Sequence, residues 1–176
     1  MNFRTAALAD VANLAAARWA FRTEDATEVP IESEQAFVQR YEAFVREALD
    51  SQRLVYWLAE TTDGELVAHM AVFIVPAIPR PSRLHDRWGY LTDCYTRPAF
   101  RSRGVGRELL ACVAAWARSR DLEMLLVWPS DRSRSFYARA GFGPDDEVRV
   151  LRLRDYDARP DPGLLPHTEQ SDDRGS

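Results

Sequence analysis

The stretch RPAFRSRGVGRELLACVAAW, residues 97–116, decides the fold because it joins two patterns of different period. The apolar run WGYLTDCYT (88–96) precedes it and is typical of a strand, whereas Leu109, Val113 and Trp116 recur at helical spacing after it. The junction between strand and helix carries little bulk and much positive charge: Arg101, Arg103, Gly104, Gly106 and Arg107.

This junction has the composition of an anion site. A helix N-terminus leaves backbone N–H groups unpaired and carries a partial positive charge. Gly104 and Gly106 would let an anion approach the backbone closely, and the arginines would add charge. The pattern therefore predicts a site for a phosphate or pyrophosphate. A tight glycine turn that only starts a helix is the alternative reading.

Two common phosphate motifs do not match. A Walker A loop needs a lysine, and the chain contains none. The dinucleotide fingerprint G-x-G-x-x-G fails because Leu109 stands where the third glycine belongs. The pattern that remains is R-x-x-G-x-G over residues 101–106.

The flanking segments predict a mixed α/β domain. The crossover from 88–96 through a helix at 104–119 to 123–128 predicts a parallel strand pair. Asp63-Gly64 is a hairpin turn signal, which favours antiparallel strands before the crossover. We expect strands at 2–7, 54–60, 65–76, 88–96, 123–128 and 147–153. We expect helices from Ala9 to Phe21, after the N-cap Ser33, at 104–119 and at 132–140.

Length and composition limit the function. The 176 residues predict one domain, 1–156, followed by a Pro- and charge-rich tail, 157–176, that we expect to be mobile. A net charge of -4 argues against nucleic-acid binding. The two cysteines, Cys94 and Cys112, form no C-x-x-C pair, which favours a reducing cytoplasm and no metal site. The sequence shows no signal peptide and no membrane span.

Two segments together resemble the GNAT superfamily of acyl-CoA-dependent N-acyltransferases. DCYTRPAFRSRGVGRELL (93–110) is similar to the family's strand, pyrophosphate loop and helix, and WPSDRSRSFYARAGF (128–142) is similar to its later segment. The resemblance covers roughly residues 1–155. It implies a central mixed antiparallel and parallel sheet flanked by helices, in which strands 88–96 and 123–128 splay apart to hold CoA.

The resemblance also implies how acetyl-CoA binds. The main chain of Cys94, Tyr95 and Thr96 would pair with the pantetheine arm like an added strand. Ser130 stands where many relatives have an asparagine that contacts the cofactor, and serine is shorter. The N–H groups of the loop would hold the pyrophosphate, with the loop's side chains adding charge: Arg101, Ser102, Arg103, Gly104, Val105, Gly106 and Arg107.

Acetylation of an amine needs a proton for the leaving thiolate and a group that accepts a proton from the amine. Tyr137 occupies the position that the family uses for the general acid, and a phenol can donate to a thiolate. Asp93, buried in an apolar strand, is the candidate for a substrate or base role, with a pKa that burial would raise. The alternatives are a packed tyrosine and a carboxylate bonded to backbone.

Other residues give weaker indications. His69 is more typical of a buried strand histidine than of a base. Glu24, Asp25 and Glu28 would favour a cationic acceptor if they border its pocket, but they also suit a solvated loop. Three arginines of the loop 77–87 oppose that charge preference, and three aromatic residues could line a pocket or pack in the core: Arg80, Arg83, Arg87, Trp57, Trp88 and Tyr90.

These observations predict an N-acetyltransferase that moves the acetyl group of acetyl-CoA directly to a primary amine of a small molecule, without a metal. A peptide or protein N-terminal acetyltransferase is the second reading, and a non-catalytic acyl-CoA sensor is the third. The sequence leaves open the acceptor, the acyl-chain length and whether the protein is a homodimer.

Overall fold

The computed structural model describes residues 1–24, 30–82, 86–145 and 148–151. The chain divides into two units, Met1–Phe142 and Gly143–Ser176, and the helices and strands found among the described residues lie in the first. Within the described residues, no helix is long and apolar enough to cross a membrane. The proposed tail, 157–176, lies outside the described residues.

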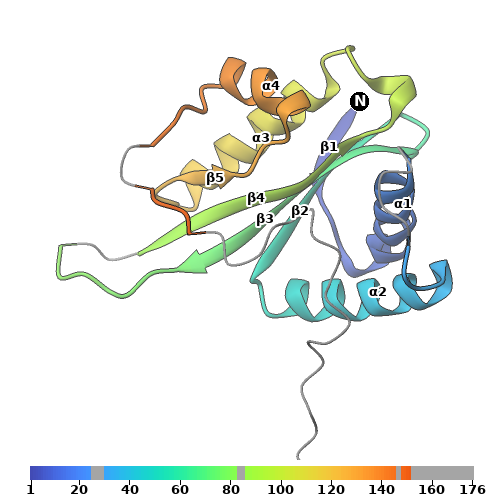
Figure 1. Ribbon diagram of the computed structural model, residues 1–176, viewed down its shortest axis with the longest axis horizontal. Coiled ribbons are helices and arrows are strands. Elements are labelled where there is room, and N and C mark those ends of the chain that lie inside the picture. The colour runs from blue at the N-terminus through green and yellow to red at the C-terminus, as the bar shows by residue number, and fades with distance from the viewer. Residues whose placement is uncertain (25–29, 83–85, 146–147, 152–176) are drawn as a thin grey trace, which may run out of the picture. The chain divides into compact units, whose positions relative to one another are not determined.

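Five strands form one sheet in the order β1-β2-β3-β4-β5 (Figure 1). The first three pairings are antiparallel, and β4 pairs with β5 in parallel, as the crossover predicted. Gly64, with φ +85°, takes the predicted turn between β2 and β3. The strands are β1 (Asn2–Thr5), β2 (Leu54–Glu60), β3 (Leu66–Pro76), β4 (Arg87–Thr96) and β5 (Leu125–Val127).

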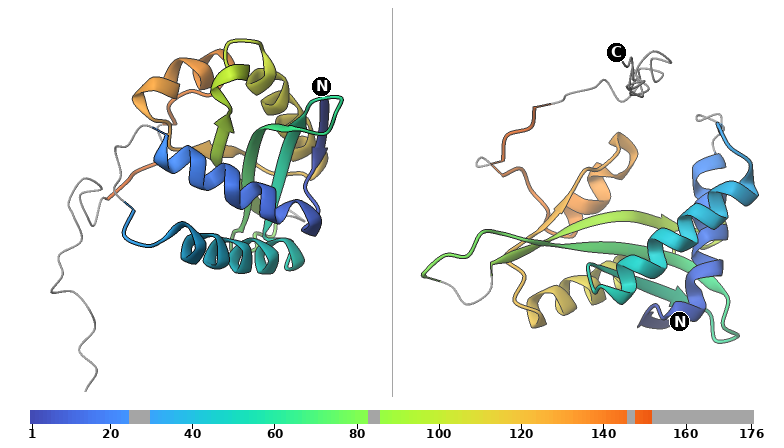
Figure 2. Two further views of the ribbon diagram at one scale, coloured as in Figure 1. Left: turned by 90° about the vertical axis from the view of Figure 1, so that its right-hand side faces the viewer. Right: turned by 90° about the horizontal axis from the view of Figure 1, so that it is seen from below.

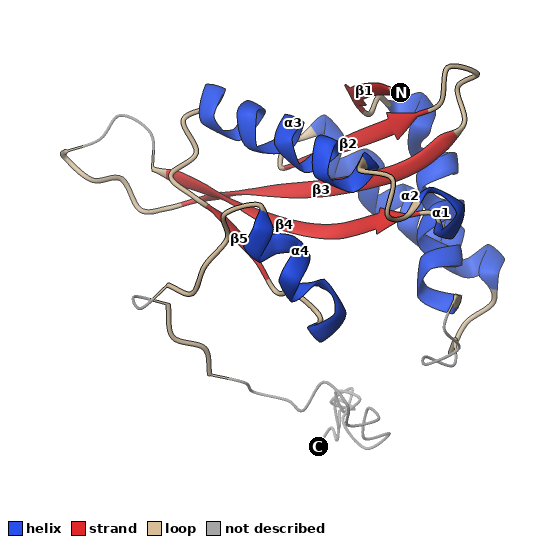
Figure 3. Cartoon of the chain, turned by 90° about the horizontal axis from the view of Figure 1, so that it is seen from above, coloured by secondary structure: helices blue, strands red, loops and turns tan. Residues whose placement is uncertain are grey.

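Helices cover both faces of the sheet (Figures 1 and 3). On one face α1 (Val11–Thr23) and α2 (Glu34–Asp50) bury Val11, Leu14 and Val45 against Leu58 of β2. Ser33 caps α2, as predicted, and its hydroxyl accepts a hydrogen bond from the Ala36 N–H.

On the other face α3 (Val105–Ser119) packs Leu109 and Val113 against Val72 and Leu91 of the sheet. Its apolar residues recur at positions three and four apart, which places them on one face of the helix. The short α4 (Arg134–Arg139) follows a 3-10 turn at Asp131–Ser133 and adds Tyr137 to the same core. The left view of Figure 2 shows α1 and α2 below the strands and α3 and α4 above them.

The last predicted strand, 147–153, is wrong for the residues that the structure describes. Residues 148–151 adopt no strand conformation. Val150 and Leu151 are 56% and 82% exposed, so the alternating pattern buries no apolar face here. Burial of one face is what normally fixes such a segment as a strand.

Candidate active site

A cleft opens where β4 and β5 separate. Their pairing ends at Leu91 and Val127, while β4 continues to Thr96. Beyond Leu91, the edge of β4 that faces β5 has no ladder partner among the described strands. A cleft of about 1130 Å³ occupies this opening, and its lining includes residues of α1, β4, α3 and α4.

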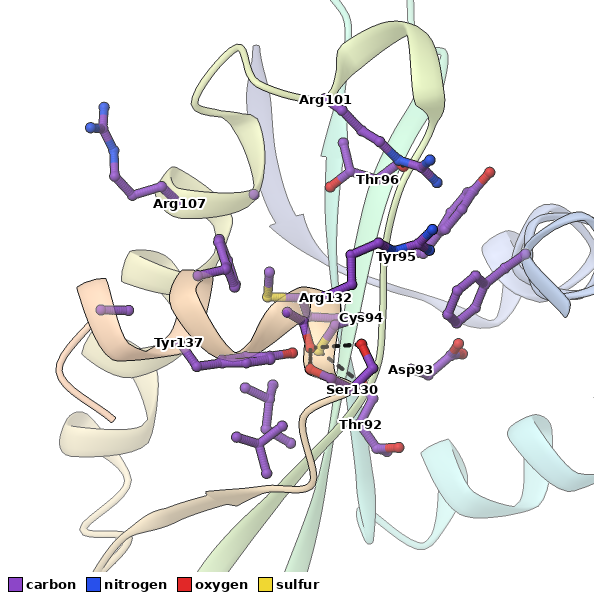
Figure 4. Close-up of a pocket in the computed structure, with 18 of the residues that line it drawn as sticks. Thr92, Asp93, Cys94, Tyr95, Thr96, Arg101, Arg107, Ser130, Arg132 and Tyr137 are labelled. Carbon is purple, nitrogen blue, oxygen red and sulfur yellow. Dashed lines mark hydrogen bonds between the residues drawn. The ribbon is translucent and has the colours of Figure 1, made fainter. Parts of the chain in front are cut away.

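Almost every site residue predicted from the sequence lines this cleft (Figure 4). The exception is Arg103, whose guanidinium lies over the Phe100 ring at 5.8 Å instead. The residues that line the cleft are Asp93, Cys94, Tyr95, Thr96, Arg101, Ser102, Gly104, Val105, Gly106, Arg107, Ser130 and Tyr137.

The glycine loop leads directly into α3. Ser102 and Gly104 have φ of +59° and +85°, and the helix begins at Val105. The left-handed φ at position 104 explains why a glycine is found there, because a residue with a Cβ atom is strained in this backbone conformation. At Gly106 a Cβ atom would lie 3.4 Å from Thr96 Oγ1 and 3.6 Å from the Phe136 ring. The backbone at the start of α3 therefore faces the cleft without a side chain in between.

Arg101 is already engaged within the protein. Its Nη1 and Nη2 donate to Glu24 Oε1 and Oε2 at 2.7 and 2.8 Å, and its Nε donates to the Thr96 carbonyl at 2.9 Å. The guanidinium also lies over the Tyr95 ring, 5.6 Å from its centre. Of the acidic segment predicted to border an acceptor pocket, Glu24 thus neutralises an arginine, while Asp25 and Glu28 lie outside the described residues.

Tyr137 extends from α4 toward the exposed edge of β4 (Figure 4). The residue is 6% exposed, and Phe136 and Phe142 pack edge-on against its ring. Burial raises the pKa of Tyr137 above 10.0, and its hydrogen bond with the Cys94 thiol adds to the rise. The phenol therefore keeps its proton at neutral pH. This arrangement places a proton donor inside the cleft.

Cys94 is a buried thiol beside that phenol. Burial raises its pKa to about 12, so it is not a thiolate at neutral pH. Its Sγ donates to the Thr92 carbonyl at 3.4 Å. Cys94 is therefore a neutral thiol, and the backbone role predicted for this residue stays a prediction.

Asp93 lies in a β-bulge and has a left-handed φ of +46°. Its Oδ1 accepts from Arg18 Nη1 at 2.7 Å and lies 3.3 Å from His69 Nε2. Its Oδ2 accepts from the hydroxyl groups of Tyr56 at 2.6 Å and Tyr41 at 3.3 Å. A bulge is a common device for aiming one side chain out of the regular alternation.

The pKa expected for Asp93 was wrong in direction. Burial acts to raise it, as predicted, but His69 and the Arg18 guanidinium stabilise the carboxylate, and Tyr56 donates to it. The net pKa lies well below the ordinary carboxyl value. These partners come from other elements of the fold, so sequence reading missed the two tyrosines and Arg18. His69 is fully buried, in agreement with its interpretation as a core residue.

Ser130 starts the turn before α4. Its hydroxyl lies 3.0 Å from that of Ser133, and its carbonyl accepts from the Ser133 and Arg134 N–H groups. Arg132, from the same turn, crosses the cleft toward Tyr95 (Figure 4). Sequence reading missed Arg132, although three arginines within residues 128–139 were a visible signal.

Some of the other aromatic residues and arginines named from the sequence line the cleft, and others lie away from it. Tyr90 lines the cleft, whereas Trp57 packs against the α3-side core and Trp88 is not among the lining residues. Arg80 pairs with Asp86 and Glu123, away from the cleft lining. Arg83 lies outside the described residues. Within the described residues, no group of three His, Cys, Asp or Glu side chains gathers to hold a metal ion.

Solved structures share this architecture. A predicted acetyltransferase from Clostridium acetobutylicum, solved with acetyl-CoA, is 25% identical with a TM-score of 0.70, and the match covers 86% of this chain and 96% of that one. A GCN5-related N-acetyltransferase from Ralstonia eutropha JMP134 is 22% identical with a TM-score of 0.69, over 86% and 97%. The second likeness shows the fold alone.

Sequence comparison gives two relatives named glucosamine 6-phosphate N-acetyltransferase. The protein from Trypanosoma brucei brucei is 27% identical over 90 residues, 51% of this chain and 58% of its own length. The protein from Oryza sativa subsp. japonica is 28% identical over 110 residues, 62% of this chain and 64% of its own length. The chain thus spans less than two thirds of either relative.

The family model for the acetyltransferase (GNAT) family matches residues 14–142, which include the glycine loop, the bulged strand and α4. The splayed parallel strands and the two motifs that first indicated this family lie within the matched region. The chain therefore belongs to the acetyltransferase (GNAT) family.

Proposed function

We propose that this chain transfers the acetyl group of acetyl-CoA to the amine of a small molecule. The observation that carries the proposal is the position of the Tyr137 hydroxyl, inside the same cleft as the glycine loop and the unpaired edge of β4. The helix start suits the phosphates of CoA, the strand edge suits its amide groups, and the phenol can supply the proton that a leaving thiolate needs.

The structure offers acetyl-CoA a fit in two places. The start of α3 presents backbone N–H groups behind Gly104 and Gly106, which suits the pyrophosphate. Cys94, Tyr95 and Thr96 present a strand edge, which suits the amide groups of the pantetheine arm. Ser102, Val105 and Arg107 line the same side of the cleft. Bound there, acetyl-CoA supplies the activated acetyl group.

The protein's own groups then orient the amine and move one proton. The amine nitrogen forms a bond to the acetyl carbon as the carbon–sulfur bond breaks, and Tyr137, which holds a proton at neutral pH, donates it to the departing sulfur. The proton that the nitrogen loses passes to water, and the Tyr137 phenolate takes up a proton from water in turn. Asp93, with its lowered pKa, stays charged and does not retain a proton from the amine. We assign Asp93 a positioning role. Its carboxylate contacts Arg18, His69 and the hydroxyl groups of two tyrosines, and these contacts hold the bulge of β4 in place beside the reacting atoms.

The names of two relatives bear on the acceptor. The two relatives carry the name of an enzyme that acetylates an amino sugar phosphate, which favours a small-molecule amine over a protein N-terminus. Both cysteines are free thiols, and we place the reaction in the reducing cytoplasm on that ground.

Incubation with acetyl-CoA and a panel of small amines, with released thiol as the readout, tests the proposal. We expect thiol release that depends on an amine and falls sharply in Tyr137→Phe. Binding of CoA, seen as a rise in melting temperature, together with no amine-dependent thiol release, would favour the sensor reading instead.

A further inference from the structure

A row of aromatic side chains crosses the face of the sheet on which α1 and α2 lie. Phe44 of α2 packs against Phe73 of β3 with ring centres 6.0 Å apart, and Phe73 stacks on Tyr90 of β4 at 6.5 Å. The Tyr90 ring meets the Trp128 ring at 4.8 Å, with the two planes 71° apart. Edge-on and offset arrangements of this kind are the ones that aromatic pairs prefer. The row ends at Trp128, the residue that follows β5.

Trp128 is open to the cleft. The residue is 55% exposed, and it lines the cleft together with Tyr90. Tryptophan is on average a highly buried residue, so this indole gains less from core packing than is usual. Ligand pockets are typically lined by aromatic side chains with a few polar groups among them, and Thr92 and Asp93 supply polar groups in the same cleft. The position of Trp128 therefore suits a role in binding a ligand.

Tyr90 and Trp128 lie on the side of the sheet opposite to α3. Leu91 and Val127 pack in the core beneath α3, and successive side chains of a strand point to opposite faces. The neighbours of these two residues, Tyr90 and Trp128, are thus placed on the other face. Phe73, which stacks on Tyr90, belongs to the core beneath α1 and α2, in agreement with this placement.

The aromatic pair and the glycine loop border different ends of the cleft. A Cβ atom at Gly106 would lie 3.4 Å from Thr96 Oγ1, so the loop borders the end of β4, whereas Trp128 contacts Tyr90 near its middle. At about 3.3 Å per residue, Tyr90 and Thr96 are roughly 20 Å apart along the strand. Acetyl-CoA bound at the loop and beside Tyr137 would occupy the α3 side (Figure 2). An acceptor would then reach the acetyl carbon from the side of the aromatic pair.

We propose that Trp128, supported by Tyr90, stacks on a ring of the acceptor, so that the substrate is an amine carried by a ring and not by an open chain. The indole presents a flat apolar face, which an aromatic ring matches. The flat face of a sugar ring has the same shape. Trp128 is then a specificity-determining residue that binds the body of the acceptor while the amine extends toward the bulge of β4. The inference rests on the proposed function and names the substrate class of that reaction.

A binding experiment tests the stacking contact without catalysis. With CoA at saturation, which has no acetyl group to transfer, phenethylamine, glucosamine and ethylamine are titrated by calorimetry. We expect at least one ring amine to bind about tenfold or more tightly than ethylamine, because apolar burial and stacking both favour it. Trp128→Leu keeps apolar bulk without a ring and should lose most of that difference, whereas Trp128→Phe should keep part of it. Trp88→Leu changes a tryptophan of β4 outside the cleft lining and should behave as wild type.

A kinetic experiment identifies the kind of ring. Acetyl transfer is compared within matched pairs, phenethylamine against hexylamine and glucosamine against ethanolamine. We expect kcat/KM to favour the ring in one pair by at least about threefold, as an aromatic contact contributes beyond its buried area. The difference should lie mainly in KM, because the contact is made before the transition state as well as in it. The pair with the larger ratio identifies an aromatic or a sugar ring. In Trp128→Leu that ratio should fall toward one, while Trp88→Leu should keep it.

Equal use of ring and chain amines, or an unchanged ratio in Trp128→Leu, would overturn the inference while leaving acetyl transfer in place. A ratio that falls equally in Trp88→Leu would also overturn it, because the effect would then come from the fold and not from stacking. If no amine is acetylated, the proposed function fails instead, and the titrations alone decide. Ring amines that bind wild type and Trp128→Leu equally, or bind neither, would then reject the stacking contact.

Discussion

Glu24 and Arg101 are 77 positions apart in the sequence and are joined by two parallel hydrogen bonds of 2.7 and 2.8 Å. The pair ties the residue that follows α1 to the loop that precedes α3. Because Arg101 also donates to the Thr96 carbonyl, one guanidinium connects α1, the end of β4 and the glycine loop. The carboxylate of Glu24 thus lies beside the glycine loop, where we propose that the pyrophosphate of CoA binds.

Glu24→Gln should tighten CoA binding. The carboxylate repels the phosphates and offsets Arg101, whose side chain is 38% exposed in this pair. An exposed ion pair is worth about 0.2–1 kcal/mol, so the Kd should fall by roughly 1.5- to 5-fold, and less in high salt. Calorimetric titration measures it. Glu65→Gln breaks a similar exposed pair with Arg97 and serves as the control. Weaker CoA binding in Glu24→Gln would show that the bridge orders the loop.

Tyr137→Phe should lower kcat by at least about tenfold, because a positioned general acid contributes about 10²–10⁴-fold. The KM for acetyl-CoA should change much less, since the lost hydrogen bond belongs mainly to the transition state. The ring contacts with Phe136 and Phe142 remain, so the melting temperature should hardly move. Steady-state thiol release and a thermal melt measure both. Equal turnover would remove Tyr137 from the mechanism.

Gly104→Ala should destabilise the protein by about 1 kcal/mol, because an L residue at φ +85° is strained. Gly64→Ala, with the same φ in an open hairpin turn, should cost a similar amount, which makes it a matched control. Only Gly104→Ala should reduce the CoA-induced rise in melting temperature. Urea unfolding and melts with CoA measure the two effects, and equal CoA responses in both variants would contradict the loop assignment.

Gly106→Ala should separate two roles of glycine, which are to allow an unusual backbone conformation and to leave space for a ligand beside the backbone. Its φ is not left-handed, and the new methyl group would meet its neighbours at ordinary contact distances. Alanine also favours a helix by about 1 kcal/mol over glycine. Stability should therefore be kept or slightly raised, while CoA binds more weakly because the methyl group stands over the backbone. Unchanged CoA affinity, by titration calorimetry, would place the pyrophosphate elsewhere.

Asp93→Asn should destabilise the fold by about 3 kcal/mol at pH 7, as expected when one partner of a buried pair is removed. The folded-state pKa of Asp93 lies below the unfolded value of about 3.9, so its contribution is full above about pH 5 and is lost as pH falls. Below pH 4, the difference between wild type and variant should shrink by about 1.4 kcal/mol per pH unit.

Urea unfolding at intervals from pH 7 to pH 3 measures that difference. Asp63→Asn, at an exposed turn position, should stay close to wild type at every pH. A difference that stays constant down to pH 3 would mean that Asp93 is not charged in the folded protein.

Most of the fold was predictable from the sequence, because the spacing of apolar residues changes at the points where strands give way to helices. The spacing of Leu109 and Val113, the cap at Ser33 and the turn at Gly64 are local signals, and the structure has all three. The strand predicted at 147–153 is wrong at the described residues 148–151, because alternation alone does not say whether a partner strand exists. Residues 148–151 alternate without burying a face.

The candidate site residues could be predicted where they lie in a short contiguous motif. Properties that depend on residues far apart in the sequence could not be predicted. The glycine loop and Tyr137 lie in short motifs, and both reached the cleft. The pKa of Asp93 depends on Arg18 of α1 and Tyr56 of β2, which no local pattern brings together. Burial was foreseen, but its effect is outweighed by charges that only the folded chain assembles.

The bulge at Asp93 changes which residues of β4 can be gained or lost in evolution. Because the register slips opposite Met70, Cys94 and Thr96 face α3, whereas Tyr95 packs against Phe21 of α1. Leu91 before the bulge and Cys94 after it both face α3, so Asp93 is the extra residue of the strand. Deletion of Asp93 would restore one-to-one pairing with β3 and leave Cys94, Tyr95 and Thr96 on their present faces. It would remove only the carboxylate that Arg18 and Tyr56 bind, so the bulge is an insertion that adds one functional group to an otherwise regular strand.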